Sequence, residues 1–447
     1  MSRPERPPAR AVLLAGLVAL GVGAGAALWS AGSVARPVAW AAVFLRGYFL
    51  AWFCYLAAAL VVSRSARRPR WVLVWIVAVA VLLRVVALAR TPPLSTDFWR
   101  YLWDGRVANA SINPFRYTPQ ASNLEHLRDG NWQWISFRDI RTIYPPFAQI
   151  VFAGLARIRS EDAQAFRWGF ALCDITSVFL LIALLRRTGH PPERVIWYAW
   201  CPLPIVEFTG GAHVDSVGIC LLLLSLWLAA RGQGKPGAAS AAALAAAMMT
   251  KGFAFFALPF FVRRGGWRFA AWFAGVCLLL AAPFLSAGPR LFDGLSAYLQ
   301  AWKANASLFA LADWLLTPVT PLHYQLTRIG SIVAILLVLT WLVVRQRPGM
   351  SGLLAAVFLA LGAQLLLSAP TLPWYVAWTV PALCWWAIPG WVLFTLTVVA
   401  QYYVRWFAPG LEYQPLWMGY LPVYALLAGQ AWWVWRRGHR SATSHRA

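Results

Sequence analysis

The sequence is poor in charged residues. Asp, Glu, Lys and Arg make up only 12% of its 447 residues, whereas 60% are hydrophobic and the mean hydropathy is +0.60. A soluble domain carries about a quarter charged residues, so this composition excludes an ordinary soluble protein. Several apolar runs reach the ~20 residues with which a helix crosses a bilayer, and the alternation of a membrane β-barrel is absent. We therefore predict an all-α polytopic membrane protein.

Acidic residues and lysines are scarce as well. Lysine occurs only at positions 235, 251 and 303, and 15 acidic residues stand against 39 Lys and Arg, which gives a net charge of +24. In a soluble protein this balance would suggest a nucleic-acid partner. Here most arginines lie in short loops between apolar runs, which is the positive-inside pattern of membrane proteins. We expect contact with membrane lipid and no nucleic-acid partner.

No two of the six cysteines have the spacing of a metal site, and all lie in or at the ends of apolar segments. We predict that they are small, buried apolar side chains. No metal site and no cofactor are predicted, although a divalent cation stays an alternative.

Hydropathy predicts roughly 12–14 transmembrane helices in one integral membrane domain over residues 1–447. An arginine-rich segment after the second predicted span marks the cytoplasmic side and places the loop at about 90–141 on the outer face. A second outer loop is predicted at about 286–324. Counting spans inward from the two ends gives conflicting parity, so one of the short segments 144–158 and 195–209 does not cross the membrane.

Helix breaks and spans are also predicted in two further regions. Residues 238–250 and 253–262 are predicted as two short helices hinged at Lys251. Near the C-terminus, 375–388 and 391–407 are each predicted to form a single span.

The first outer loop begins with a polar stretch in which charges of both signs alternate with aromatics. It reads STDFWRYLWDGRVANASINPFRYTP over residues 95–119, and the segment 132–137 further along the loop is typical of a short interfacial helix. A neutral sugar hydroxyl is a poor nucleophile, so transfer to it needs a base, which one carboxylate provides. A phosphate leaving group needs cations beside it. One carboxylate with nearby Arg or Lys therefore suits an inverting transferase.

This loop resembles the first outer loop of the GT-C superfamily, membrane glycosyltransferases that use polyprenyl-phosphate sugars, and most closely its bacterial mannosyltransferase-like members. The matching residues are Asp97, Arg100, Tyr101, Trp103, Asp104, Gly105, Asn113, Pro114, Phe115, Tyr144, Pro145 and Pro146. Thr96 departs from the pattern, where an acid is frequent. The resemblance continues at 200–215, with Cys201 in place of Asn, and at 250–252, and its motifs cover about half of the chain.

The resemblance implies a GT-C-like helical bundle. It also implies a hexosyltransferase that moves a hexose, with mannose as the favoured sugar, from a polyprenyl phosphate to an outer-face glycolipid or glycan. It places the enzyme in a bacterial inner membrane, with Asp97 as general base and Arg100 keeping that carboxylate ionised. The substrate-binding residues that it implies are Arg100, Tyr101, Asp104, Arg106, Tyr144, Glu207, His213, Asp215 and Lys251.

Each of these residues also has a structural interpretation. Asp97 could cap a helix beside Thr96, and Asp104 could pair with Arg100 or Arg106. Glu207, His213 and Asp215 could tie a broken helix together or form an incomplete metal site, since ionisable groups within a membrane are rare. Lys251 could hold a lipid phosphate or extend its ammonium to the interface. Trp374 and Tyr375 suit either an interfacial belt or a sugar platform.

The alternative function is a transporter or flippase of lipid-linked sugars, because broken helices and intramembrane charges also mark transporters. Transporters place their key charges near the membrane midplane. The densest polar cluster of this chain lies in an outer loop instead, which favours an enzyme. A third possibility is a scaffold subunit without catalytic activity.

Overall fold

The computed structural model describes residues 7–31, 37–65, 69–90, 94–407 and 416–444. Within these residues the regular structure is helical, and the single β-bridge pairs Ala304 with Pro370. The prediction of an all-α polytopic membrane protein is confirmed.

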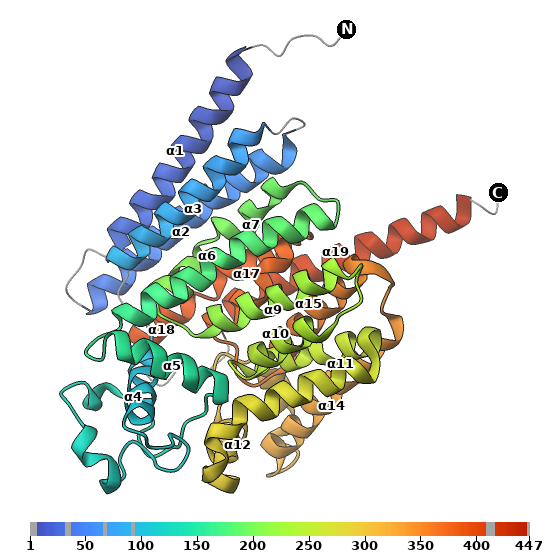
Figure 1. The fold of residues 1–447 in the computed structure, drawn as a ribbon. Coiled ribbons are helices and arrows are strands. Elements are labelled where there is room, and N and C mark those ends of the chain that lie inside the picture. The colour runs from blue at the N-terminus through green and yellow to red at the C-terminus, as the bar shows by residue number, and fades with distance from the viewer. Residues whose placement is uncertain (1–6, 32–36, 66–68, 91–93, 408–415, 445–447) are drawn as a thin grey trace.

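The N-terminal helices form a layer on one side of the molecule (Figure 1). They are α1 (Pro7–Ala31), α2 (Pro37–Arg64) and α3 (Arg70–Arg90). Pro7 and Pro37 stand at the first helical position of α1 and α2, where the missing proline N–H breaks no hydrogen bond of the helix. The layer packs against α6 (Gln164–Arg187) and the broken segment that comes after it.

Six helical segments in the described residues are long and apolar enough to cross a membrane, and a seventh counts if one bent pair is a single span. The chain is therefore a multi-pass membrane protein, but this number is below the 12–14 helices predicted. The difference arises because several apolar segments are short or broken. Two apolar helices of 10–17 residues, at 146–158 and 238–248, fall short of the bilayer thickness.

Two segments that were predicted as single spans are broken in the structure. Residues 373–407 form α16 (Pro373–Val376), the 3-10 helix η7 (Ala377–Cys384), α17 (Pro389–Thr397) and α18 (Ala400–Phe407). Pro381 lies inside η7, where a proline has no N–H to donate to the preceding turn. The predictions of unbroken spans at 375–388 and 391–407 were therefore wrong.

The segment at 195–209 is also broken. It contains the last residue of η3 (Pro192–Val195), then α7 (Ile196–Ala199), α8 (Pro202–Pro204) and the π-helix η4 (Ile205–Gly210). The piece 202–210 meets α9 (Asp215–Arg231) at an angle of 119°, as in a broken span or a re-entrant loop. Non-helical backbone of this kind is tolerated at membrane depth only where protein buries it.

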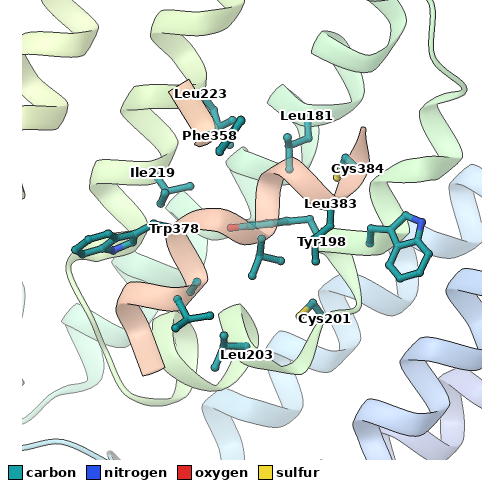
Figure 2. Packing of buried hydrophobic residues seen from close by; sticks show 14 of the residues in the cluster. Leu181, Tyr198, Cys201, Leu203, Ile219, Leu223, Phe358, Trp378, Leu383 and Cys384 are labelled. Atoms are coloured by element: carbon teal, nitrogen blue, oxygen red, sulfur yellow. The ribbon is translucent and has the colours of Figure 1, made fainter. Parts of the chain in front are cut away.

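The hydrophobic core surrounds these broken segments. Figure 2 shows Leu181 of α6 and Tyr198 of α7 close to Leu383 of η7, and Leu223 of α9 beside Phe358, and all five are buried. The peripheral helix α14 (His323–Arg345) differs, because only 17% of its apolar window is buried. Its outward side chains are apolar, as expected for a surface that faces lipid.

The remaining helices lead to the polar end of the molecule. Figure 1 shows α4 (Asp97–Asn109) and the loops after it at one end of the bundle, where α12 (Asp293–Ala301) also lies. The others are η1 (Ser122–Leu127), η2 (Trp132–Trp134), α5 (Pro146–Ile158), α10 (Ala238–Met248), η5 (Gly252–Ala257), α11 (Leu258–Ala281), η6 (Ala282–Phe292), α13 (Leu308–Leu316), α15 (Gly349–Leu367) and α19 (Trp417–Ser444).

Two local predictions can be compared with these bounds. The chain breaks at Lys251 as predicted, since α10 ends before it and Lys251 itself is extended, with φ −152° and ψ 128°. The interfacial helix expected at 132–137 is only the three-residue 3-10 turn η2, and Phe137 has a positive φ of 54°. A residue with positive φ cannot continue a right-handed helix.

Candidate active site

A pocket of about 180 Å³ opens at the polar end of the bundle. Several parts of the chain line it. They are the start of α4, the loop before α5, Lys251 after α10, the end of α12 with the residues that follow it, and the broken segments near the C-terminus. Its lining residues are Ser95, Thr96, Asp97, Arg100, Ser136, Phe137, Ile140, Arg141, Ile143, Tyr144, Lys251, Tyr298, Trp302, Ala304, Leu372, Trp374, Tyr375 and Gln401. Every charged residue in this set lies in the N-terminal 251 residues of the chain.

Asp97 is the first residue of α4, and its carboxylate is the only one among the described residues that line the pocket. The N-cap is Thr96, and it makes no capping hydrogen bond with its side chain. The backbone N–H of Asp97 donates to Ser95 Oγ at 3.1 Å. The side chain of Asp97 is 30% exposed and points toward His213. The geometry thus favours a pocket role for this carboxylate over a role as helix cap.

His213 lies between two carboxylates behind the pocket wall. Its Nδ1 is 3.9 Å from Asp97 Oδ2, its Nε2 is 3.6 Å from Glu207 Oε2, and the imidazole is fully buried. The hydroxyl of Tyr402 donates to Glu207 Oε2 at 2.9 Å. The indole of Trp374, which lines the pocket, stacks on the imidazole with ring centroids 4.0 Å apart. A buried polar chain therefore extends from Asp97 into the protein.

An irregular backbone delivers His213 to this position. The π-helix η4 carries Glu207, and π-helical turns are frequent at functional sites. Ala212 is in the left-handed region with φ 55°, which is strained for a residue with a Cβ. A Cβ at Gly211 would lie 2.9 Å from Glu207 O and 3.1 Å from His213 Cδ2, so only glycine leaves room for the imidazole. Such strain persists where the surrounding structure fixes it, often at functional sites.

Lys251 is a lysine that lines the pocket, beside the arginines Arg100 and Arg141. Its Nζ lies 3.3 Å from Asp215 Oδ2, and it stands over the rings of Tyr144 and Tyr375 at 5.3 and 5.4 Å from their centroids. The indole N–H of Trp378 donates to Asp215 Oδ1 at 2.7 Å. Asp215 is fully buried, so its carboxylate and the ammonium of Lys251 are held close to each other beneath the pocket.

Arg100 is paired with Asp104. Its Nε donates to Asp104 Oδ1 at 2.9 Å, because residues four apart on α4 lie on the same face. Asp104 also accepts hydrogen bonds from Thr142 and from Gln149 Nε2. The alternative in which Asp104 pairs with Arg100 is the one that the structure contains.

The predicted site residues thus divide into two groups. Asp97, Arg100, Tyr144 and Lys251 line the pocket. Burial, with the Asp97 carboxylate as the second cause, raises the pKa of Tyr144 well above its ordinary value, so its hydroxyl stays protonated and can donate. The others lie behind the pocket: Tyr101, Asp104, Glu207, His213 and Asp215 are buried, and Arg106 pairs with Asp129 on the far side of α4.

Several aromatic lining residues had not been identified from the sequence. Phe137, Tyr298 and Trp302 are examples, and Gln401 is a further lining residue. Phe137 lies in the same outer loop as Asp97, in the segment predicted as an interfacial helix, whereas Tyr298, Trp302 and Gln401 are about 200 residues or more further along the chain, so local patterns give no signal for them. The position of Tyr298 and Trp302 in the second predicted outer loop was the only available indication.

No group of three or more His, Cys, Asp or Glu side chains in the described part of the chain is arranged to hold a metal ion. The imidazole nitrogens of His213 lie 3.6 Å from the carboxylate of Glu207 and 3.9 Å from that of Asp97, which are contact distances between side chains.

Comparison with known proteins gave one match. A family model described as alpha-(1->6)-mannopyranosyltransferase, N-terminal domain (MptA_B family), matches residues 10–264, more than half of the chain. No curated protein and no solved structure matches. The matched residues include Asp97, Glu207, His213, Asp215 and Lys251.

Proposed function

We propose, from the premise that the chain belongs to the MptA_B family of alpha-(1->6)-mannopyranosyltransferases, that it is an inverting GT-C-type enzyme which takes mannose from a polyprenyl phosphate. The acceptor would be a glycolipid or glycan at the outer face of a bacterial inner membrane. The family is one of mannosyltransferases, so the chain is a glycosyltransferase and the transporter alternative is not needed. The observation that carries the proposal is that Asp97 and Lys251 line the same pocket.

In the proposed reaction, the Asp97 carboxylate takes the proton from an acceptor hydroxyl, whose oxygen attacks the anomeric carbon of the donor. The bond from that carbon to the phosphate oxygen breaks, and the polyprenyl phosphate leaves with the electron pair. A single displacement needs one base and a stabilised leaving group, and it inverts the anomeric centre. The pocket offers a single carboxylate for this step, whereas a double displacement would need a nucleophile as well.

Lys251 is proposed to hold the donor phosphate. Its side chain is only 13% exposed, and a cation at such a position stabilises the charge that develops on a leaving phosphate. Asp215 holds the ammonium from below, and the two aromatic rings fix it from the sides. A phosphate that approaches from the pocket meets the free face of this ammonium.

The other predicted substrate-binding residues would act at or through this site. Tyr144 is proposed to donate its hydroxyl to a sugar oxygen, since it faces the pocket and stays protonated. His213 and Glu207 would orient the Asp97 carboxylate from behind. Arg100, Tyr101, Asp104 and Arg106 would hold the wall that carries Asp97, because their contacts are to protein.

The substitution Asp97→Asn tests the base. Asparagine keeps the shape of the side chain and caps helices about as well as aspartate, but it cannot accept the proton. Losing a general base typically costs about 10²–10⁴ in rate, and we expect that loss in transfer from polyprenyl-phosphate mannose by membranes containing the variant. Asp139→Asn is the control, because Asp139 is exposed in the same outer loop. Near-normal transfer by Asp97→Asn at normal expression would exclude the base role.

A further inference from the structure

Two aromatic rings from different loops meet at the pocket. Phe137 precedes α5 and Trp302 follows α12, and their ring centroids are 4.2 Å apart with the planes tilted by 58°. Both side chains line the pocket. Phe137 nevertheless remains 48% exposed, so it contributes little to a core. An exposed aromatic at a pocket wall is free to contact a ligand.

The backbone of Phe137 is held in an unfavourable conformation. Its φ of 54° is in the left-handed region, which residues with a Cβ rarely adopt. Arg100 Nη1 donates to the carbonyl oxygens of Phe137 at 3.4 Å and Ile140 at 3.0 Å. Ser136 Oγ and Thr96 Oγ1 are hydrogen-bonded at 2.8 Å. Thr96 and Arg100 lie on either side of Asp97 in the chain, so the turn that presents Phe137 is fastened directly to the segment that presents the carboxylate.

From Trp302 an aromatic series continues to the cation. The ring of Tyr298 lies 5.4 Å from that of Trp302, and the hydroxyls of Tyr298 and Tyr375 are hydrogen-bonded at 2.8 Å. Tyr375 in turn contacts Lys251. The surface from Phe137 to Lys251 is therefore mainly aromatic, with hydroxyl groups at intervals. Side chains of this amphipathic kind, with an apolar ring and a polar tip, suit a ligand that has both apolar faces and hydroxyls.

The charged residues at this wall of the pocket favour a neutral ligand over an anionic one. Both arginines that line it are already paired: Arg100 with Asp104 at 2.9 Å and Arg141 with Asp293 at 2.9 Å. An anionic ligand at this wall would have to compete with those carboxylates. A neutral sugar ring needs no counter-charge, because it offers C–H groups to an aromatic face and hydroxyls to polar groups.

We propose that Phe137 and Trp302 form a carbohydrate subsite that holds a second hexose of the acceptor, the one next to the sugar whose hydroxyl reacts at Asp97. This inference rests on the proposed function in one respect, since it takes the acceptor to be a glycan. The subsite gives a longer acceptor an advantage over a single sugar. Arg100 acts in it as a positioning residue that fixes the Phe137 turn relative to Asp97.

Acceptor length tests the subsite. Purified full-length protein is assayed with polyprenyl-phosphate mannose and two acceptors, a mannoside with one hexose and an alpha-(1->6)-linked mannobioside. For Trp302→Ala we expect the KM of the mannobioside to rise about tenfold, the size of one good aromatic contact, with the KM of the monosaccharide acceptor and of the donor unchanged. Trp302→Phe keeps a ring and should retain most of the advantage. Trp134→Ala is the control, since Trp134 is an exposed tryptophan of the outer loop that carries Phe137 but does not line the pocket.

An equal change for both acceptors, or no change for either, would overturn the subsite. A second measurement separates this outcome from failure of the proposed reaction. Binding of alpha-(1->6)-linked mannobiose to Asp97→Asn protein is measured by calorimetry, with and without Trp302→Ala. We expect binding to Asp97→Asn that weakens about tenfold in the double variant. Binding that Trp302→Ala leaves unchanged would refute the subsite whatever the role of Asp97.

Discussion

Gly105 lies at the closest approach of α4 to α5, and the substitution Gly105→Ala probes how firmly Asp97 is positioned. A Cβ at this residue would be 2.4 Å from the carbonyl oxygen of Phe152 and 2.7 Å from its carbonyl carbon. Both atoms belong to the backbone, so no side-chain rotation relieves the clash. Ordinary contact begins near 3.4 Å, and the two helices would have to separate by about 1 Å. Because α4 begins at Asp97, that separation displaces the carboxylate.

Two opposing terms set the size of the effect on stability. Alanine is favoured over glycine inside a helix by about 1 kcal/mol, because glycine loses more backbone entropy on folding. Forcing an extra methyl group into a packed contact costs about 1–3 kcal/mol. The difference between the two is a net loss of about 0–2 kcal/mol in the free energy of unfolding. The effect on rate is larger, since a shift of ~1 Å in a reacting group can cost about 10²-fold.

The assay compares Gly105→Ala with Gly154→Ala. Gly154 lies on α5, and a Cβ there would meet no atom within 4 Å, so this variant is expected to keep its activity and to unfold at the same or a higher temperature. Thermal unfolding in detergent gives the stability, and initial rates of mannose transfer give the activity. If Gly105→Ala is as stable and as active as Gly154→Ala, the close approach of α4 to α5 does not position the carboxylate.

Two further predictions concern buried charges. Lys251→Ala is expected to raise the KM for the polyprenyl-phosphate donor more than the KM for the acceptor. The control Lys235→Ala, at an exposed position, should change neither KM. Equal effects of Lys251→Ala on both substrates would contradict phosphate binding. Asp174→Asn removes the counter-charge of Arg84, whose Nε is 2.9 Å away with both side chains almost fully buried, and this should lower stability by about 3–5 kcal/mol. Thermal unfolding checks it, and a double variant with Arg84→Met should recover part of the loss.

Much of the helical scaffold was predictable, because long apolar runs leave a chain in a membrane few alternatives to a helix. The long apolar runs of the sequence at 38–62, 71–88 and 166–185 lie within α2, α3 and α6. Six of the described helical segments have the length and hydropathy of an unbroken span, fewer than the 12–14 helices predicted, because hydropathy does not distinguish a continuous helix from an apolar run that folds into short pieces. The π-helix at 205–210 and the bend after it depend on burial by neighbouring helices, which a single sequence does not describe.

Only part of the candidate site was predictable, because contacts between distant parts of the chain leave no local sequence pattern. The family resemblance identified Asp97 and His213, and the structure brings them within 3.9 Å of each other. The pairing of Arg84 with Asp174 was overlooked, although one charged residue inside each of two predicted spans was a readable signal of a buried pair. Trp302 has no local pattern that marks it as a pocket residue. Its role depends on packing between loops that are more than 160 residues apart.

The charged residues that line the pocket all come from one half of the chain, and this distribution bears on how such a protein can diversify. All four charged lining residues, Asp97, Arg100, Arg141 and Lys251, lie within residues 10–264, whereas the lining residues after 264 are uncharged. Mutations in the C-terminal half can change the aromatic lining residues after 264 while leaving Asp97 and Lys251 in place. On the proposed function, gene duplicates can therefore diverge in the glycans that they accept by drift in that half, while the charged groups are inherited unchanged.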